Sequence, residues 1–342
     1  MTLPEGPIDV HGHAMPTTVL RWLQDRGLAD LSEVTDHVVR IDPEVSGVGR
    51  GSPLPLAPSM TDPVARIDEL DAMGLALQAV SLPPFLMASG SLDGNLVQEL
   101  TRRGNDGLAN YCAHDDRLLA LGIVPSGFDT SVQEARRCLD ELGMAGIAIG
   151  SRGGGVDLDH PVNEDLWAFL GERRAFVFLH PSAVPDPQRL ADYWLPQLIG
   201  YPMETAIAAA RLVLSGTLTD HPLTLCLAHG GGCLPGLGPR LDMGWSRKRQ
   251  AHTTPEPPRE AFRRLYYDSA VFDPVALARL VEDVGATQVL LGTDHPFDLA
   301  EHDPVGLVDA AGLTPAERQA VLEDNARAVL GLAPSTARLL PR

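Results

Sequence analysis

The sequence predicts an α/β fold, a (β/α)8 barrel, from three observations. Apolar runs of strand length recur eight times along the 342 residues, each followed by a turn signal and a stretch with helical spacing. These runs are apolar on both faces, as in parallel sheets that helices cover on both sides. Strand and helix alternating eight times is the pattern of a closed barrel. An open doubly wound sheet is the alternative, but no G-x-G-x-x-G follows the first run, so nothing supports a dinucleotide site.

The expected strands follow the chain in order. They are residues 7–13, 76–83, 118–125, 143–151, 175–180, 223–229, 265–271 and 288–294. Helix starts lie between them. Asp62-Pro63, Asp273-Pro274 and Thr314-Pro315 each place a capping side chain before a proline at the first helical position. Ser131-x-x-Glu134 is typical of a capping box.

One segment departs from this alternation. Residues 15–58 contain a short strand at 37–41 and a Gly/Pro/Ser-rich run at 47–58. We expect a small insertion after the first strand that passes over the barrel mouth. The chain is otherwise expected to be a single domain of residues 1–342.

The charge balance excludes several classes of partner. Lys+Arg number 27 and Asp+Glu 45, which gives a formal net charge of −18. Nucleic acids and anionic membranes are bound by basic surfaces, so neither is an expected partner. The apolar runs are too short to cross a bilayer, and the N-terminus lacks the features of a signal peptide. We therefore expect a cytoplasmic protein whose four cysteines are free thiols.

Lysine is nearly absent, because Lys248 is the only one. Schiff-base, P-loop and kinase chemistries each need a placed ammonium group. No organic cofactor is therefore expected.

Polar side chains gather where the expected strands end. The first strand ends in His11-Gly12-His13, the fifth in His180 and the eighth in Asp294. Strand side chains alternate, so His11 and His13 face the same side, and all these ends meet at one mouth of a barrel. Three imidazoles and a carboxylate suit one divalent ion, zinc or alternatively manganese. His229 ends the sixth strand, where it can take a proton from metal-bound water.

Each signal also has a plain structural explanation. An H-x-H pair arises by chance, a histidine at a strand end can be a satisfied polar residue, and an aspartate before His-Pro can cap a turn. Four such signals at the carboxyl ends of separate strands favour a metal site over coincidence. The orientation of His295 stays open.

These motifs resemble a known family. They are Asp9-Val10-His11-Gly12-His13, Leu179-His180-Pro181, Ala228-His229-Gly230-Gly231-Gly232 and Gly292-Thr293-Asp294-His295-Pro296-Phe297. They look like the amidohydrolase superfamily, and within it the branch of 2-amino-3-carboxymuconate-6-semialdehyde decarboxylase (ACMSD) and related aromatic-acid decarboxylases. The resemblance covers nearly the whole chain.

The resemblance implies a role for each site residue. The metal ligands would be His11, His13, His180 and Asp294, with His229 as the acid/base and Asp294 as an alternative proton carrier. Substrate contacts would come from Phe297, from Tyr193 or Trp194, from Arg50, and from Arg240 reaching the neighbouring active site of a homodimer. Arg50 stands several residues earlier than the family pattern has its arginine.

The resemblance also implies the activity. It is a metal-dependent, non-oxidative decarboxylase, a carbon–carbon lyase, of a small unsaturated or aromatic carboxylic acid, with ACMSD or a close variant as the specific assignment. One metal is expected, because no lysine is placed to bridge two. The alternatives are a mononuclear hydrolase or hydratase of a small amide, lactone or enol carboxylate, and a non-catalytic scaffold protein.

Overall fold

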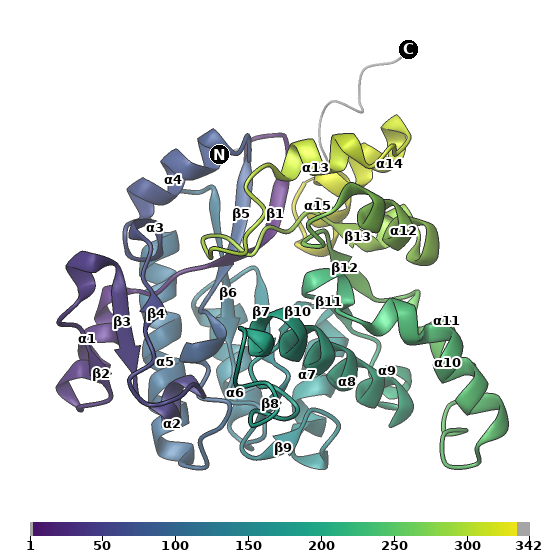
Figure 1. Cartoon of the computed structure of the whole chain (residues 1–342), viewed down its shortest axis with the longest axis horizontal. Coiled ribbons are helices and arrows are strands. Elements are labelled where there is room, and N and C mark those ends of the chain that lie inside the picture. The colour runs from purple at the N-terminus through teal and green to yellow at the C-terminus, as the bar shows by residue number, and fades with distance from the viewer. Residues whose placement is uncertain (1–2, 334–342) are drawn as a thin grey trace.

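A computed structural model describes residues 3–333 of the chain (Figure 1). Its centre is an eight-stranded parallel sheet with the strand order β1-β5-β6-β7-β10-β11-β12-β13. The (β/α)8 prediction is confirmed, and each predicted strand run contains one observed strand. The strands are β1 (Ile8–His13), β5 (Leu77–Ser81), β6 (Leu118–Ile123), β7 (Gly146–Gly150), β10 (Phe176–His180), β11 (Thr224–Leu227), β12 (Tyr266–Asp268) and β13 (Val289–Leu290).

The sheet closes on itself between its last and first strands. The Val10 amide donates to the Leu291 carbonyl over 2.9 Å, and the Asp294 amide donates to the His11 carbonyl over 3.0 Å. A parallel bridge also joins Gly12 and His295. The residues directly after β13 are therefore held against the carboxyl end of β1, which brings Asp294 beside His11.

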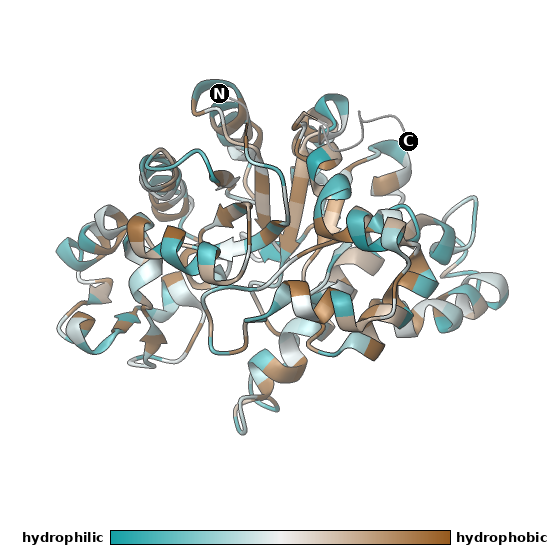
Figure 2. Cartoon of the chain, turned by 90° about the horizontal axis from the view of Figure 1, so that it is seen from above, coloured by the Kyte–Doolittle hydropathy of each residue, from teal (hydrophilic) through white to brown (hydrophobic). Residues whose placement is uncertain are grey.

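Helices cover the outside of the barrel, and in Figure 2 they carry hydrophilic and hydrophobic residues in alternation. The longer ones are α1 (Thr17–Asp25), α4 (Pro63–Ala72), α5 (Gly94–Cys112), α7 (Glu164–Arg173), α8 (Tyr201–Leu214), α10 (Leu234–Arg247) and α12 (Pro274–Val284). The shorter ones are α2 (Pro43–Ser46), α3 (Pro58–Thr61), α6 (Ser131–Arg136), α9 (Thr217–Asp220), α11 (Pro258–Phe262), α13 (Pro304–Ala310), α14 (Pro315–Gln319) and α15 (Asn325–Val329). Among the described helices, none has the combination of length and apolar composition that a membrane span needs.

Three of the four predicted helix caps are present. Asp62 caps α4, Asp273 caps α12, and Thr314 forms a capping box with Glu317 at α14. The capping box predicted at Ser131 is wrong, because α6 begins there without a side-chain cap. The buried Glu134 carboxylate instead accepts hydrogen bonds from Asn105 and Arg137. These hydrogen bonds satisfy the Glu134 carboxylate in the core, so it does not reach back to the start of the helix.

The segment after β1 forms a small antiparallel sheet of β2 (Ala29–Asp30), β3 (Val38–Ile41) and β4 (Leu54–Pro55). The short strand predicted at residues 37–41 is confirmed by β3. Val39 and Leu54 are buried, which anchors this sheet to the rest of the core. In Figure 1 the segment lies to one side of the barrel, next to α5.

Candidate metal centre

The candidate site contains two histidines from the end of β1. His11 and His13 are both fully buried, and their Nε2 atoms lie 3.2 Å apart. A tetrahedral zinc ion with Zn–N bonds of roughly 2.0–2.1 Å requires its imidazole nitrogens to be about 3.3 Å apart. The predicted common orientation of the two side chains is therefore observed, at the spacing that two ligands of one ion have.

Asp294 and His180 complete the predicted set. The Asp294 Oδ1 atom lies 3.0 Å from His11 Nε2, 3.2 Å from His13 Nε2 and 3.9 Å from His180 Nε2. Asp294 Oδ1 and His180 Nε2 are both buried without a hydrogen-bond partner within residues 3–333. Buried polar atoms are normally satisfied, so these two atoms fit a cation that they would share with His11 and His13.

His229 sits on a strained turn beside this group. It has a φ of 57°, and the three glycines that follow also have positive φ. Its Nε2 atom lies 3.2 Å from Asp294 Oδ2, the carboxylate oxygen that faces away from His11 and His13. A backbone held in the left-handed region costs free energy, and such residues concentrate at functional sites. This turn places the His229 imidazole against the metal group.

Two overlapping sets of four side chains can hold an ion. His11, His180, His229 and Asp294 bring one donor atom each within 4.8 Å of one another. The predicted set has His13 in place of His229. Both sets share His11, His180 and Asp294.

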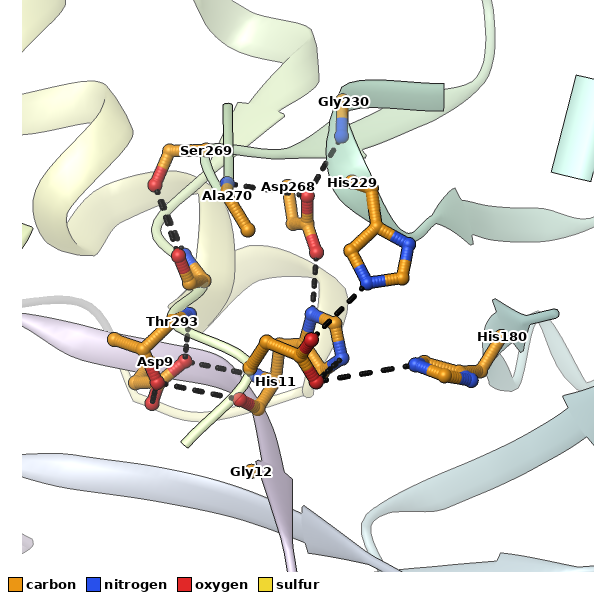
Figure 3. Close-up of polar contacts among 12 residues, drawn as sticks. Asp9, His11, Gly12, His180, His229, Gly230, Asp268, Ser269, Ala270 and Thr293 are labelled. Carbon is orange, nitrogen blue, oxygen red and sulfur yellow. Dashed lines mark hydrogen bonds and ion pairs between the residues drawn. The ribbon is translucent and has the colours of Figure 1, made fainter. Parts of the chain in front are cut away.

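Asp268 contacts His11 on the side of its ring that faces away from Asp294. Figure 3 shows its carboxylate between His11 and Gly230. Asp268 Oδ2 lies 2.6 Å from His11 Nδ1, and Oδ1 accepts the Gly230 amide over 2.8 Å. A carboxylate at Nδ1 fixes the proton there and leaves Nε2 free to bind a metal. The same carboxylate tethers the turn that carries His229.

Burial and charge set the protonation of the group. Burial lowers the pKa of His13 to about 4 and holds that of His180 well below its usual value. Burial opposes charge on His11 as well, but the carboxylates of Asp294 and Asp268 raise its pKa to about 10. Burial opposes ionisation of Asp294, yet contacts with His11 and the other histidines hold its pKa well below the usual range. His13 and His180 therefore present neutral imidazoles and Asp294 a carboxylate, the forms that metals bind.

A cavity of about 540 Å³ opens onto this group. His180, His229 and Asp294 lie in its wall, and the inserted segment contributes Leu54. The rest of the lining is mainly apolar, and no lysine or arginine of residues 3–333 takes part in it. Such a cavity suits the hydrophobic body of a small molecule.

The substrate residues that the resemblance implied fall into two groups. Phe297 and Trp194 line the cavity, whereas Tyr193 is outside its lining and 86% exposed. Arg50 lies outside the lining and pairs with Asp42 over 2.9 Å, with its side chain 80% exposed. Arg240 is exposed on α10 and forms no ion pair with another described residue. The structure therefore brings the two aromatic residues to the site and leaves both arginines outside the cavity of their own chain.

His295 and Arg66 support the site from outside. The His295 Nδ1 atom lies 2.7 Å from Arg66 Nη1, and its Nε2 atom lies 3.0 Å from Glu69, so its imidazole is engaged away from the metal group. Arg66 is fully buried and also donates to the His13 carbonyl. Sequence reasoning missed Arg66 because nothing in a helical D-P-V-A-R sequence reveals a buried guanidinium. It also missed Asp268 as a site residue, because the predicted seventh strand ran from 265 to 271, whereas β12 ends at Asp268.

The fold and this site define a metal-binding (β/α)8 barrel. The sequence pattern of the amidohydrolase family matches residues 8–332, and the chain belongs to that family. The chain is 34% identical over 280 residues to 2-amino-3-carboxymuconate-6-semialdehyde decarboxylase from Dictyostelium discoideum, covering 80% of this chain and 78% of that protein. The resemblance drawn from the motifs is thereby confirmed.

Solved structures have the same fold. The 5-carboxyvanillate decarboxylase from Sphingomonas paucimobilis superposes with a TM-score of 0.80 at 22% identity, covering 96% of this chain and 99% of that one. A dihydroxybenzoic acid decarboxylase from Polaromonas, solved with bound manganese and an inhibitor, gives a TM-score of 0.74 at 21% identity, covering 96% and 97%.

Proposed function

We propose that this protein is a metal-dependent, non-oxidative decarboxylase of a small unsaturated or aromatic carboxylic acid. The observation that carries the proposal is the convergence of four metal-binding side chains, with two unpartnered buried donor atoms, on an apolar cavity. Decarboxylase relatives, among them the 34% identical protein named above, support the same reaction. Their names also support the specific proposal of ACMSD activity or that of a close variant.

We propose that His11, His13, His180 and Asp294 hold one divalent ion, zinc, with manganese as the alternative. A bound ion supplies Lewis acidity, which polarises an oxygen of the substrate. Lys248, the only lysine, is exposed just after α10 and lies outside the cavity lining, which supports a single metal. The Polaromonas decarboxylase structure contains manganese, so manganese is the alternative metal that we propose to test.

His229 and Asp294 are proposed to handle the proton. When the bond between the carboxyl carbon and the substrate breaks, its electron pair stays on the substrate carbon and carbon dioxide leaves. That carbon then needs one proton, and His229 lies in the cavity wall with Nε2 held 3.2 Å from Asp294 Oδ2. A histidine fixed by a carboxylate can deliver a proton at a defined position. The apolar walls exclude water, which strengthens these interactions.

Within residues 3–333, no lysine or arginine lines the cavity to bind a second carboxylate of the substrate. Two carboxylates, Asp294 and Asp298, lie in the wall, and the net charge of −18 adds a repelling field. We propose that Arg240 of a second copy enters the cavity and binds a substrate carboxylate, since the guanidinium fork fits both oxygens.

An apolar face beside Arg240 supports a homodimer. Helix α8 packs against α10, and exposed apolar side chains lie along both helices and the turn before α8. They are Leu198, Ile199, Met203, Ile207, Leu237 and Met243, each at least 39% exposed. Exposed apolar patches of this kind mark interaction sites. The free cysteines Cys112, Cys138, Cys226 and Cys233 support the proposed cytoplasmic location.

Product analysis tests the proposed reaction. Purified protein, with metal content measured, is incubated with small aromatic and unsaturated acids, including the ACMSD substrate, and carbon dioxide is quantified. We expect release without an added organic cofactor, loss after chelation, and recovery with zinc or manganese. Addition of one water per substrate without carbon dioxide would establish the hydrolase or hydratase alternative. Metal-free protein with no turnover of any acid would favour the scaffold alternative.

A further inference from the structure

Tyr201 is a cavity residue to which the proposed reaction assigns no role. It begins α8 and lies in the cavity wall, where its ring makes an edge contact with His180, with ring centroids 6.2 Å apart at 77°. His180 is one of the proposed metal ligands. The phenol ring therefore lies beside the end of the cavity where the carboxylic acid would react.

The Tyr201 hydroxyl differs from those of the two buried tyrosines Tyr111 and Tyr267. Tyr111 donates its hydroxyl hydrogen to the Ser59 carbonyl, and Tyr267 donates to the Phe262 carbonyl over 2.8 Å. No hydrogen bond of the Tyr201 hydroxyl is found within residues 3–333, and the residue is half-buried in the cavity wall. A half-buried phenol in a cavity wall can donate its hydroxyl hydrogen to whatever fills the cavity. Because the residue faces the cavity, the partner available to this hydroxyl is a molecule bound there.

Few groups of the wall can donate to such a molecule. Apart from the histidines, the side chains that carry an N–H or O–H are Trp194, Gln197 and Tyr201. Trp194 is 60% exposed at the rim, whereas the Tyr201 ring packs on His180. Tyr201 is thus the neutral donor with a direct contact to the metal group.

We propose that Tyr201 is a specificity-determining residue whose hydroxyl donates a hydrogen bond to an oxygen substituent, a hydroxyl or carbonyl, next to the reacting carboxylate of the substrate. The inference rests on the proposed function, because it needs the acid to bind with its carboxylate at the metal group. A site with a donor for a substrate hydroxyl discriminates against an analogue that lacks it, since the donor is then buried unpaired.

A pair of acids of similar size tests the inference. In 2,6-dihydroxybenzoate and 2,6-dimethylbenzoate, both ring positions next to the carboxylate carry a hydroxyl in the first and a methyl in the second. Calorimetry measures the dissociation constants of both acids for the metal-loaded wild type, Tyr201→Phe and Tyr193→Phe. The last variant is a matched control, because Tyr193 is 86% exposed and outside the cavity wall.

We expect Tyr201→Phe to weaken binding of the dihydroxy acid about 3- to 10-fold, the range of one neutral hydrogen bond, and to change the dimethyl acid less than about 2-fold. Tyr193→Phe is expected to change neither. An equal change for both acids, no change for either, or no binding of either acid to the wild type would overturn the inference.

Turnover separates this inference from the proposed function. Carbon dioxide release is measured with the same proteins and with the wider set of acids described above. Release by the wild type with an unselective effect of Tyr201→Phe would refute the role of Tyr201 and leave the decarboxylase standing. Selective binding without release from any acid would refute the decarboxylase and retain the hydrogen bond.

Discussion

Asp268→Asn is expected to weaken metal binding although Asp268 touches no ion itself. The Asp268 carboxylate lies 2.6 Å from His11 Nδ1 and accepts the Gly230 amide over 2.8 Å. An asparagine keeps one oxygen, and the Gly230 N–H requires it. The NH2 group of the new asparagine then faces His11 Nδ1, and Nδ1 must accept a hydrogen bond from it. The imidazole proton of His11 therefore moves to Nε2, the atom that is proposed to bind the metal.

The magnitude follows from the type of interaction lost. Removing the carboxylate that orients a ligating histidine costs about 10- to 100-fold in metal affinity, or about 1.4–2.7 kcal/mol. The dissociation constant of zinc is measured on metal-stripped protein by competition with a chelating dye. Asp273→Asn is the control, because Asp273 caps α12 and asparagine caps a helix equally well. A zinc constant for Asp268→Asn within about 2-fold of the wild type would refute the proposed orientation of His11.

Three further outcomes follow from the structure. His13→Ala should lose the metal, whereas His229→Ala should retain it and release carbon dioxide about 100-fold more slowly, as loss of a general acid does; metal analysis showing the reverse would make His229 the ligand. Burial raises the pKa of Glu204 above its unfolded value, so stability from this group is complete at low pH and declines as pH rises through the folded pKa. Glu204→Gln should therefore raise the Tm near pH 8 with a gap that closes toward about pH 4.5, the unfolded pKa of glutamate; a gap that widens on acidification contradicts this. Mixing Arg240→Ala with His229→Ala protein should give more activity than the sum of the two weakly active variants, through hybrid dimers, and no gain would argue against a shared site.

The barrel and most of the candidate site could be predicted because two features of the sequence, apolar runs and the polar residues that end them, indicate where strands lie in the fold. A buried parallel strand is a continuous apolar run, and its carboxyl end lies at the mouth of the barrel. His11, His180, His229 and Asp294 each follow such a run, and the structure brings them within reach of one ion.

Orientations that tertiary contacts decide could not be predicted. His295 directly follows Asp294, yet its ring is held by Arg66 and Glu69 from α4, more than two hundred residues away in the sequence. Tyr193 and Trp194 are adjacent and both have positive φ, so a single residue of register decides which one lines the cavity. The pattern of apolar and polar residues predicts neither the orientation of the His295 ring nor which of Tyr193 and Trp194 lines the cavity.

The buried charges around the site explain why a divalent ion suits this barrel. Asp9, Asp268 and Asp294 are all buried, and Asp9 accepts hydrogen bonds from four donors, which fits its ionised form although burial raises its pKa. Arg66 is the buried cation among them, linked to Asp9 through Gln78. Three carboxylates and one guanidinium leave two negative charges in a medium where uncompensated charge is costly. An ion of charge +2 neutralises them, while the protonated His11 of the metal-free protein neutralises only one. If the proposed ligands bind a divalent ion, removal of the metal by chelation is expected to lower the Tm of the barrel, and an unchanged Tm would argue against this coupling.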